Sequence, residues 1–87
     1  MINYDRLPAH MRDGMRLYIE QHIRPGGFLM AVLSNNLTGA IGLADETNRD
    51  RLPDYVGFLY NEVPADYWGS PAKVDAHLGA SQQTPAI

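Results

Sequence analysis

The sequence has no cysteine among its 87 residues. This absence excludes disulfide bonds, zinc ribbons, iron–sulfur clusters and thiol nucleophiles. The three histidines, His10, His22 and His77, do not have the spacing of a metal-binding motif, so the sequence predicts no metal site. No serine stands in the sequence context of a hydrolase nucleophile. We therefore expect no cofactor and no catalytic residue, and the sequence predicts a protein that is not an enzyme.

Lysine is almost absent as well, since Lys73 is the only one, and the formal net charge is −3. A protein that binds duplex nucleic acid usually presents a broad basic face, so this class of partner is disfavoured. The charge is unevenly distributed: residues 1–26 carry four arginines and three acids, whereas residues 45–66 carry six acids and two arginines. A small anionic ligand at the arginine-bearing end agrees with this pattern.

Long apolar segments are also missing. Residues 27–44 contain no charged side chain, but glycines and polar residues interrupt them before about 20 apolar residues accumulate, so we expect no membrane span. The first six residues lack the apolar core of an export signal, which predicts a cytoplasmic protein. The length fits one helical domain over residues 1–79, followed by a flexible tail at residues 80–87.

Helical periodicity defines the expected elements. Apolar residues recur at steps of three and four in residues 27–44, which predicts one buried central helix there. A first helix is expected from Leu7 to His22. A third is expected from about residue 47 to Pro64 with a distortion at Pro53, or alternatively from Leu52, because a proline deep inside a helix is costly. A short fourth helix covers residues 72–78.

These elements predict an all-α fold of three main helices, an antiparallel pair plus a packing helix, with a short C-terminal helix. Because a chain this small buries only a limited core, we expect a homo-oligomer. Small residues form a stripe on the predicted central helix at Ala31, Ser34, Thr38 and Gly42. This stripe suits either packing within the monomer or a subunit interface.

The segment from Arg24 to Phe28 has the clearest chemical content. A helix N-terminus offers free N–H groups, glycine permits close approach of a phosphate, and a guanidinium binds phosphate with two donors. A simple interhelical turn is the alternative interpretation. We expect Tyr18, Tyr55 and Tyr60 in the core, whereas aromatic residues outside the helices are freer to stack on bases. The candidate ligand-binding residues are Tyr4, Arg12, Arg24, Gly26, Gly27, Phe28 and Trp68.

Several segments resemble a family of small phage and prophage proteins over residues 7–78: residues 10–12, 18–20, 25–37, 44–45, 58–64 and 68–71. The chain departs from that pattern at Gly27, where serine is usual, at Asn36, where aspartate is usual, and at His77, where tryptophan is usual. The first departure removes a side-chain hydroxyl from the turn. The helical pattern is similar to that of the anti-CBASS sponges, small helical oligomers that sequester cyclic di- and trinucleotide signals of host immunity without degrading them.

The resemblance implies a phage immune-evasion protein that binds cyclic oligonucleotides in the cytoplasm of the infected bacterium. It also implies a homo-oligomer, from a dimer to a hexamer, in which two copies of Arg24, Gly26 and Gly27 would meet across a two-fold axis. The rival hypothesis is a phage inhibitor of the anti-CRISPR type, which binds a host defence protein through the acidic residues 45–66. A hydrolase of the signal is a third hypothesis.

Overall fold

The computed structural model describes residues 2–80, which form six α-helices and two short 3₁₀ helices and contain no strand. The all-α class is therefore confirmed, with more and shorter helices than the sequence pattern predicts. The elements, in chain order, are η1 (Ala9–Met11), α1 (Arg12–Gln21), α2 (Gly27–Leu33), α3 (Leu37–Leu43), α4 (Glu46–Asp50), α5 (Leu52–Glu62), η2 (Ala65–Tyr67) and α6 (Pro71–Ala80).

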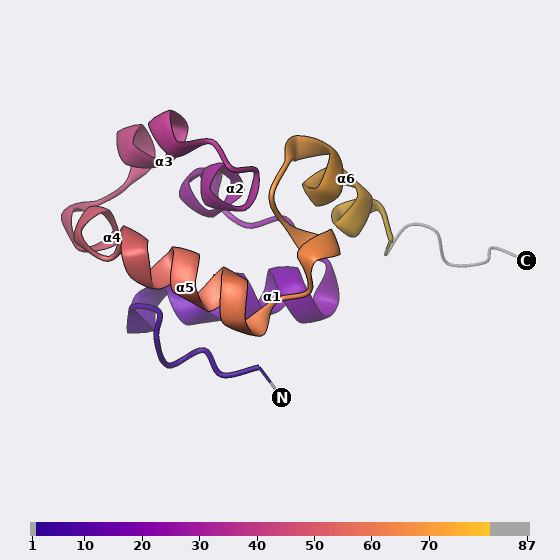
Figure 1. Cartoon of the computed structure of the whole chain (residues 1–87), viewed down its shortest axis with the longest axis horizontal. Coiled ribbons are helices and arrows are strands. Elements are labelled where there is room, and N and C mark those ends of the chain that lie inside the picture. The colour runs from indigo at the N-terminus through magenta and orange to yellow at the C-terminus, as the bar shows by residue number, and fades with distance from the viewer. Residues whose placement is uncertain (1, 81–87) are drawn as a thin grey trace, which may run out of the picture.

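The core lies mainly between α1, α2 and α5. Helix α1 buries Met15, Tyr18 and Ile19 and confirms the first helix, although the α-helix begins at Arg12 and not at Leu7. Helix α5 contributes Tyr55 and Phe58, both fully buried. Figure 1 shows α1 and α5 running across the view, whereas α2 is seen nearly along its axis, so α1 and α2 cross steeply.

The uncharged residues 27–44 form two helices instead of the predicted single one. Asn35 adopts a left-handed conformation, with φ of 63°, which ends α2 and reverses the chain. The side chain of Asn36 then caps α3, since its Oδ1 accepts a hydrogen bond from the Gly39 N–H at 3.0 Å. Helices α2 and α3 pack against each other. Leu37 and Leu43 of α3 are 68% and 61% exposed. The second half of the predicted buried central helix therefore lies at the surface.

The predicted third helix is also divided, into α4 and α5, with Arg51 between them. Pro53 lies in the first turn of α5, where its missing N–H has no helical partner, so it does not distort the helix. The alternative prediction of a helix that begins at Leu52 is therefore confirmed. The Asp45 carboxylate caps α4 by accepting from the Asn48 N–H at 2.7 Å. The burial of Tyr18 and Tyr55 is confirmed, but the core assignment of Tyr60 is wrong, because Tyr60 is 75% exposed.

The last helix, α6, confirms the short C-terminal helix and buries Val74. The Ser70 hydroxyl caps α6 by accepting a hydrogen bond from the Lys73 N–H at 3.2 Å. Most of the predicted tail, residues 81–87, lies outside the described residues. Within residues 2–80, no helix has the length and apolar content needed to cross a bilayer. The oligomeric state stays a prediction.

Candidate functional site

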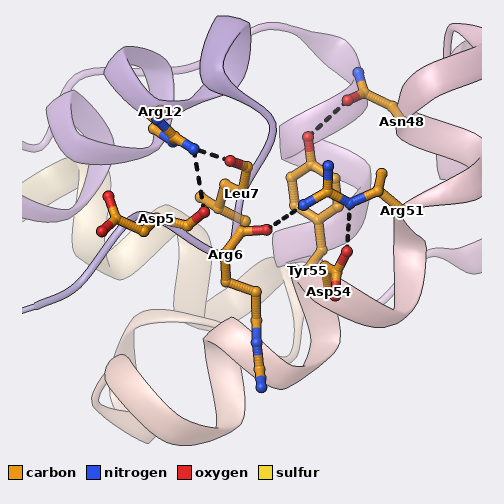
Figure 2. Close-up of polar contacts among 8 residues, drawn as sticks. All are labelled: Asp5, Arg6, Leu7, Arg12, Asn48, Arg51, Asp54 and Tyr55. Atoms are coloured by element: carbon orange, nitrogen blue, oxygen red, sulfur yellow. Dashed lines mark hydrogen bonds and ion pairs between the residues drawn. The ribbon is translucent and has the colours of Figure 1, made fainter.

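The N-terminal segment, residues 2–8, is held in place without forming a helix. Arg12 of α1 donates from Nε to the Leu7 carbonyl at 2.9 Å and from Nη2 to the Asp5 carbonyl at 3.1 Å. Arg51, at the start of α5, donates from Nη2 to the Arg6 carbonyl at 2.7 Å, as Figure 2 shows. Hydrogen bonds from a charged donor are stronger than neutral ones, so two arginines fix this backbone from two helices.

Further contacts anchor the same segment. Leu7 is fully buried, and the buried Tyr4 ring lies 5.5 Å from the Phe58 ring, centroid to centroid. The Asn3 N–H donates to Glu62 Oε1 at 3.0 Å, which ties the segment to the last turn of α5. Any side chain that projects from residues 3–7 therefore starts from a fixed backbone position.

The Arg6 side chain extends away from this network and along α5 (Figure 2). Its guanidinium lies over Gly57, and a Cβ atom at position 57 would collide with Arg6 Nη1. Glycine inside a helix costs about 1 kcal/mol relative to alanine, so Gly57 provides space for the guanidinium at the expense of helix stability. Within residues 2–80 the Arg6 guanidinium has neither a hydrogen-bond acceptor nor an acidic partner.

A cavity of about 300 Å³ adjoins this guanidinium, and we name it the Arg6 cavity. Its volume is at the lower end of the range of about 300–1,000 Å³ that is typical of ligand pockets. It combines a cationic group with amide and carboxylate groups, which suits a small ligand with both a negative charge and polar edges. The lining residues are Asn3, Arg6, Phe58, Asn61 and Glu62.

Two of the predicted ligand-binding residues, Tyr4 and Arg12, already make hydrogen bonds within the fold, so their side chains are not free to bind a ligand as predicted. Tyr4 is only 8% exposed, and its hydroxyl donates to Glu20 Oε2 at 2.8 Å. Burial, together with this hydrogen bond to a carboxylate, raises the pKa of the Tyr4 phenol above its ordinary value. The Arg12 guanidinium donates to the backbone carbonyls of Asp5 and Leu7.

The predicted segment at the start of α2 is partly exposed and partly buried. Arg24, Gly26 and Gly27 lie at the surface, and none of them lines the Arg6 cavity. Phe28 is buried, with its ring edge-on to Tyr55 at 5.2 Å. Helix α2 has seven residues and begins directly after this turn. Anion binding at this segment and a simple interhelical turn both stay predictions.

Trp68 lies on the loop after η2, as the sequence predicts, but it is partly buried. Its indole N–H donates to the Val63 carbonyl at 3.4 Å, and its ring lies edge-on to Tyr60 at 5.4 Å. Tyr60 is the more exposed aromatic residue of this pair. An aromatic contact to a ligand on this side of the protein would therefore fall to Tyr60.

The residues around the Arg6 cavity were not recognised from the sequence. One signal was available: Gly57 lies inside an otherwise helical apolar pattern, and such a glycine often marks a close approach by another group. The sequence could not show that the approaching group is Arg6, because 51 positions separate the two and the contact depends on how residues 2–8 pack.

A second polar cluster joins α6 to the end of α1. His77 Nε2 hydrogen-bonds to the Tyr18 carbonyl at 2.6 Å, and His22 Nδ1 to the His77 carbonyl at 2.8 Å. The two imidazole rings are 4.2 Å apart. Burial lowers the pKa of His77, and the neighbouring charge of His22 acts in the same direction. No group of three potential metal ligands occurs in residues 2–80.

Comparison with known proteins yields no relative: the chain matches no family model, no curated protein and no solved structure. A functional proposal for this protein therefore depends on the chain's own geometry and on the motifs in its sequence.

Proposed function

We propose that the protein sequesters a cyclic di- or trinucleotide, the second messenger of CBASS immunity, by non-covalent binding during phage infection. The observation that carries this proposal is the Arg6 guanidinium, which has no partner within residues 2–80 and adjoins a polar cavity of about 300 Å³. A guanidinium binds a phosphate diester with two parallel donors. The resemblance of the sequence to small phage proteins, and of its predicted helical pattern to the anti-CBASS sponges, favours a cyclic nucleotide over other small anions.

The lining of the Arg6 cavity supports binding without cleavage. It contains no histidine, serine or threonine that could act as a nucleophile or a proton shuttle. Glu62 is its single carboxylate, and one oxygen of Glu62 accepts the Asn3 N–H. Phosphodiester hydrolysis needs an activated nucleophile and stabilisation of the developing charge. Arg6 would supply the second, and we assign Glu62, the one possible general base in this lining, to ligand binding.

A homo-oligomer is part of the proposal. The Arg6 cavity is large enough for about one nucleotide unit, so a cyclic dinucleotide would need a second surface to cover its other half. Exposed apolar side chains on one protein often mark an interaction surface. On α3 and α5 these side chains are Leu37, Ile41, Leu43, Val56 and Tyr60, with exposures of 68%, 40%, 61%, 48% and 75%.

Isothermal titration calorimetry with a panel of cyclic di- and trinucleotides tests the proposal. We expect a dissociation constant of about 1 μM or lower for at least one ligand, a loss of at least about tenfold for Arg6→Gln, and no change for Arg24→Gln. Light scattering with and without ligand reports the oligomer, and recovery of intact ligand after heat denaturation shows that it was not cleaved. The absence of binding to every ligand, or a loss confined to Arg24→Gln, overturns the proposal.

The second candidate function is inhibition of a host defence protein through the acidic residues 45–66. Its specific support is the exposed Leu43 next to the exposed acids Asp45, Glu46 and Asp50. Three acids of the same stretch have partners: Asp45 accepts the Asn48 N–H and contacts His10, Asp54 pairs with Arg51, and Glu62 accepts the Asn3 N–H. A variant with Glu46→Lys and Asp50→Lys would lose host-protein binding under this hypothesis but would keep cyclic-nucleotide binding under the first.

A further inference from the structure

The Arg6 cavity offers acceptors as well as a cation, and this combination restricts its ligand. We infer that the cavity takes a guanine-containing nucleotide, with the phosphate on Arg6 and the donor edge of the base on Glu62. This inference rests on the proposed function and adds to it the identity of the base.

Glu62 is the residue that restricts which ligand the cavity can bind. One of its oxygens, Oε1, accepts the Asn3 N–H at 3.0 Å, and within residues 2–80 Oε2 accepts no hydrogen bond. An ionised carboxylate is an acceptor only, with about four lone-pair positions on its two oxygens. It would repel a second phosphate, so the part of the ligand that lies against Glu62 has to donate.

The side-chain amides of Asn3 and Asn61 also line the cavity, and in each one polar atom is hydrogen-bonded within the protein and the other is not. Asn61 Nδ2 donates to the Gly57 carbonyl at 2.8 Å, which leaves Oδ1 as the remaining acceptor of this cavity-lining residue. Asn3 Oδ1 accepts the Asp5 N–H at 2.9 Å, which leaves the Asn3 amino group as a donor. The groups left over are therefore one guanidinium, both Glu62 oxygens (Oε2 and the second lone pair of Oε1), one amide oxygen and one amide nitrogen.

Guanine fits this set better than the other bases. Its Watson–Crick edge presents the N1–H and N2–H donors side by side, which matches a carboxylate, and its O6 acceptor suits an amide donor such as that of Asn3. Adenine places its N1 lone pair beside its amino group, so one contact with Glu62 would be repulsive. Uracil offers a single N–H between two carbonyls. A well-formed bidentate pair discriminates against the wrong base by about five- to 150-fold.

Arg6 would bind the phosphate of the ligand. Its guanidinium is held over Gly57 by space and by the clamped backbone, not by an ion pair, so its five N–H donors stay available. The cation and the carboxylate line one cavity without pairing with each other. A ligand that carries a phosphate and a donor edge would satisfy both groups at once.

Calorimetric titration with cyclic di-GMP, cyclic di-AMP and cyclic di-IMP tests this inference, because hypoxanthine keeps the N1–H of guanine but lacks its amino group. We expect cyclic di-GMP to bind at least about tenfold more tightly than cyclic di-AMP, with cyclic di-IMP between them. Glu62→Gln should remove this preference by weakening cyclic di-GMP about tenfold, while its amide oxygen still accepts the Asn3 N–H. Arg6→Gln should weaken all three ligands alike.

Glu20→Gln is the matched control, because it removes the same charge from a residue that accepts a hydrogen bond from the N-terminal segment but does not line the Arg6 cavity. It should leave the preference for guanine unchanged. Equal affinities of the wild-type protein for cyclic di-GMP and cyclic di-AMP overturn the inference and leave the proposed function standing. Failure of all cyclic nucleotides to bind overturns both.

Discussion

Arg6 Nη1 lies in the space that a Cβ atom of residue 57 would occupy. The guanidinium and the glycine lie 51 positions apart in the chain, and Arg51, next to α5, holds the Arg6 carbonyl in place. A cation thus rests on a helix surface without an acid to neutralise it. This arrangement allows the position of the guanidinium to be changed without altering any charge.

Gly57→Ala should displace the Arg6 guanidinium and weaken ligand binding at least about tenfold while leaving the fold intact. The colliding group is the end of a flexible side chain, so it can swing out at little cost. Alanine also favours the helix by up to about 1 kcal/mol. The free energy of unfolding, from urea denaturation, should therefore be unchanged or up to about 1 kcal/mol higher, whereas calorimetry should show the weakened binding.

Gly79→Ala is the control for this variant, because a Cβ atom there meets nothing within 4 Å. It should leave binding unchanged. If Gly57→Ala bound the cyclic nucleotide as tightly as the wild-type protein, the Arg6 cavity would not be the binding site.

The turn between α2 and α3 gives a second prediction. Asn35 has φ of 63°, a conformation that costs an ordinary L-residue about 1–2 kcal/mol but costs glycine nothing comparable. We expect Asn35→Ala to lower the free energy of unfolding by about 1 kcal/mol and Asn35→Gly to lower it by no more than about 0.5 kcal/mol. Chemical denaturation followed by circular dichroism measures both. An Asn35→Ala protein with unchanged stability would favour one continuous helix over residues 27–44.

The sequence was informative about helix type and less so about helix ends. The apolar spacing of Met15, Tyr18 and Ile19 predicted α1 correctly, because the buried face of a helix repeats along the chain. The same spacing in residues 27–44 predicted one helix where the structure has two. Asn35 and Asn36 can either continue a helix or end it, and the packing of α3 on α2 decides which occurs. Exposed leucines such as Leu37 also weaken any inference from periodicity to burial.

The candidate site was harder to predict than the fold. The sequence drew attention to Arg24 and Arg12, but a charge has no functional meaning until its neighbours are known. Arg12 proved to hold backbone carbonyls, whereas Arg6 proved to have no partner in the described part of the chain. Both outcomes depend on the course of residues 2–8, which have no periodic pattern to read.

Tyr55 and Asn48 give a prediction on stability. Tyr55 is fully buried, and its hydroxyl donates to Asn48 Oδ1 at 2.7 Å, which joins α5 to α4. Tyr55→Phe leaves the buried amide oxygen of Asn48 without this donor, so the free energy of unfolding should fall by about 1–2 kcal/mol. Tyr60→Phe, at an exposed position, should change it by less than about 0.5 kcal/mol. Equal effects of the two substitutions would contradict a structural role for the buried bond.

The histidine cluster between α1 and α6 predicts how stability depends on pH. His77 is 5% exposed, and burial, with His22 as a neighbour, lowers its pKa, although the hydrogen bond to the Tyr18 carbonyl acts in the opposite direction. The ionisable groups facing it are Tyr18 of α1, His22 directly after α1, and Asp66 and Tyr67 of η2, and the charge of Asp75 on its own helix acts on Tyr18. Burial raises the pKa of Tyr18 to about 12, so this phenol stays neutral throughout the range considered.

The direction of the effect follows from the lowered pKa. In the unfolded chain His77 takes up a proton near its ordinary pKa of about 6.5, whereas in the folded chain it does so at lower pH. The stability that the neutral imidazole contributes is therefore complete above about pH 6.5 and decreases as the pH falls below that value. The urea midpoint should drop between about pH 6.5 and about pH 5, and His77→Gln should reduce this drop. His10→Gln, at an exposed residue of η1, removes only the 3.1 Å contact of His10 with Asp45 and should not reduce the drop. A drop of the same size in His77→Gln would assign the pH dependence to other groups.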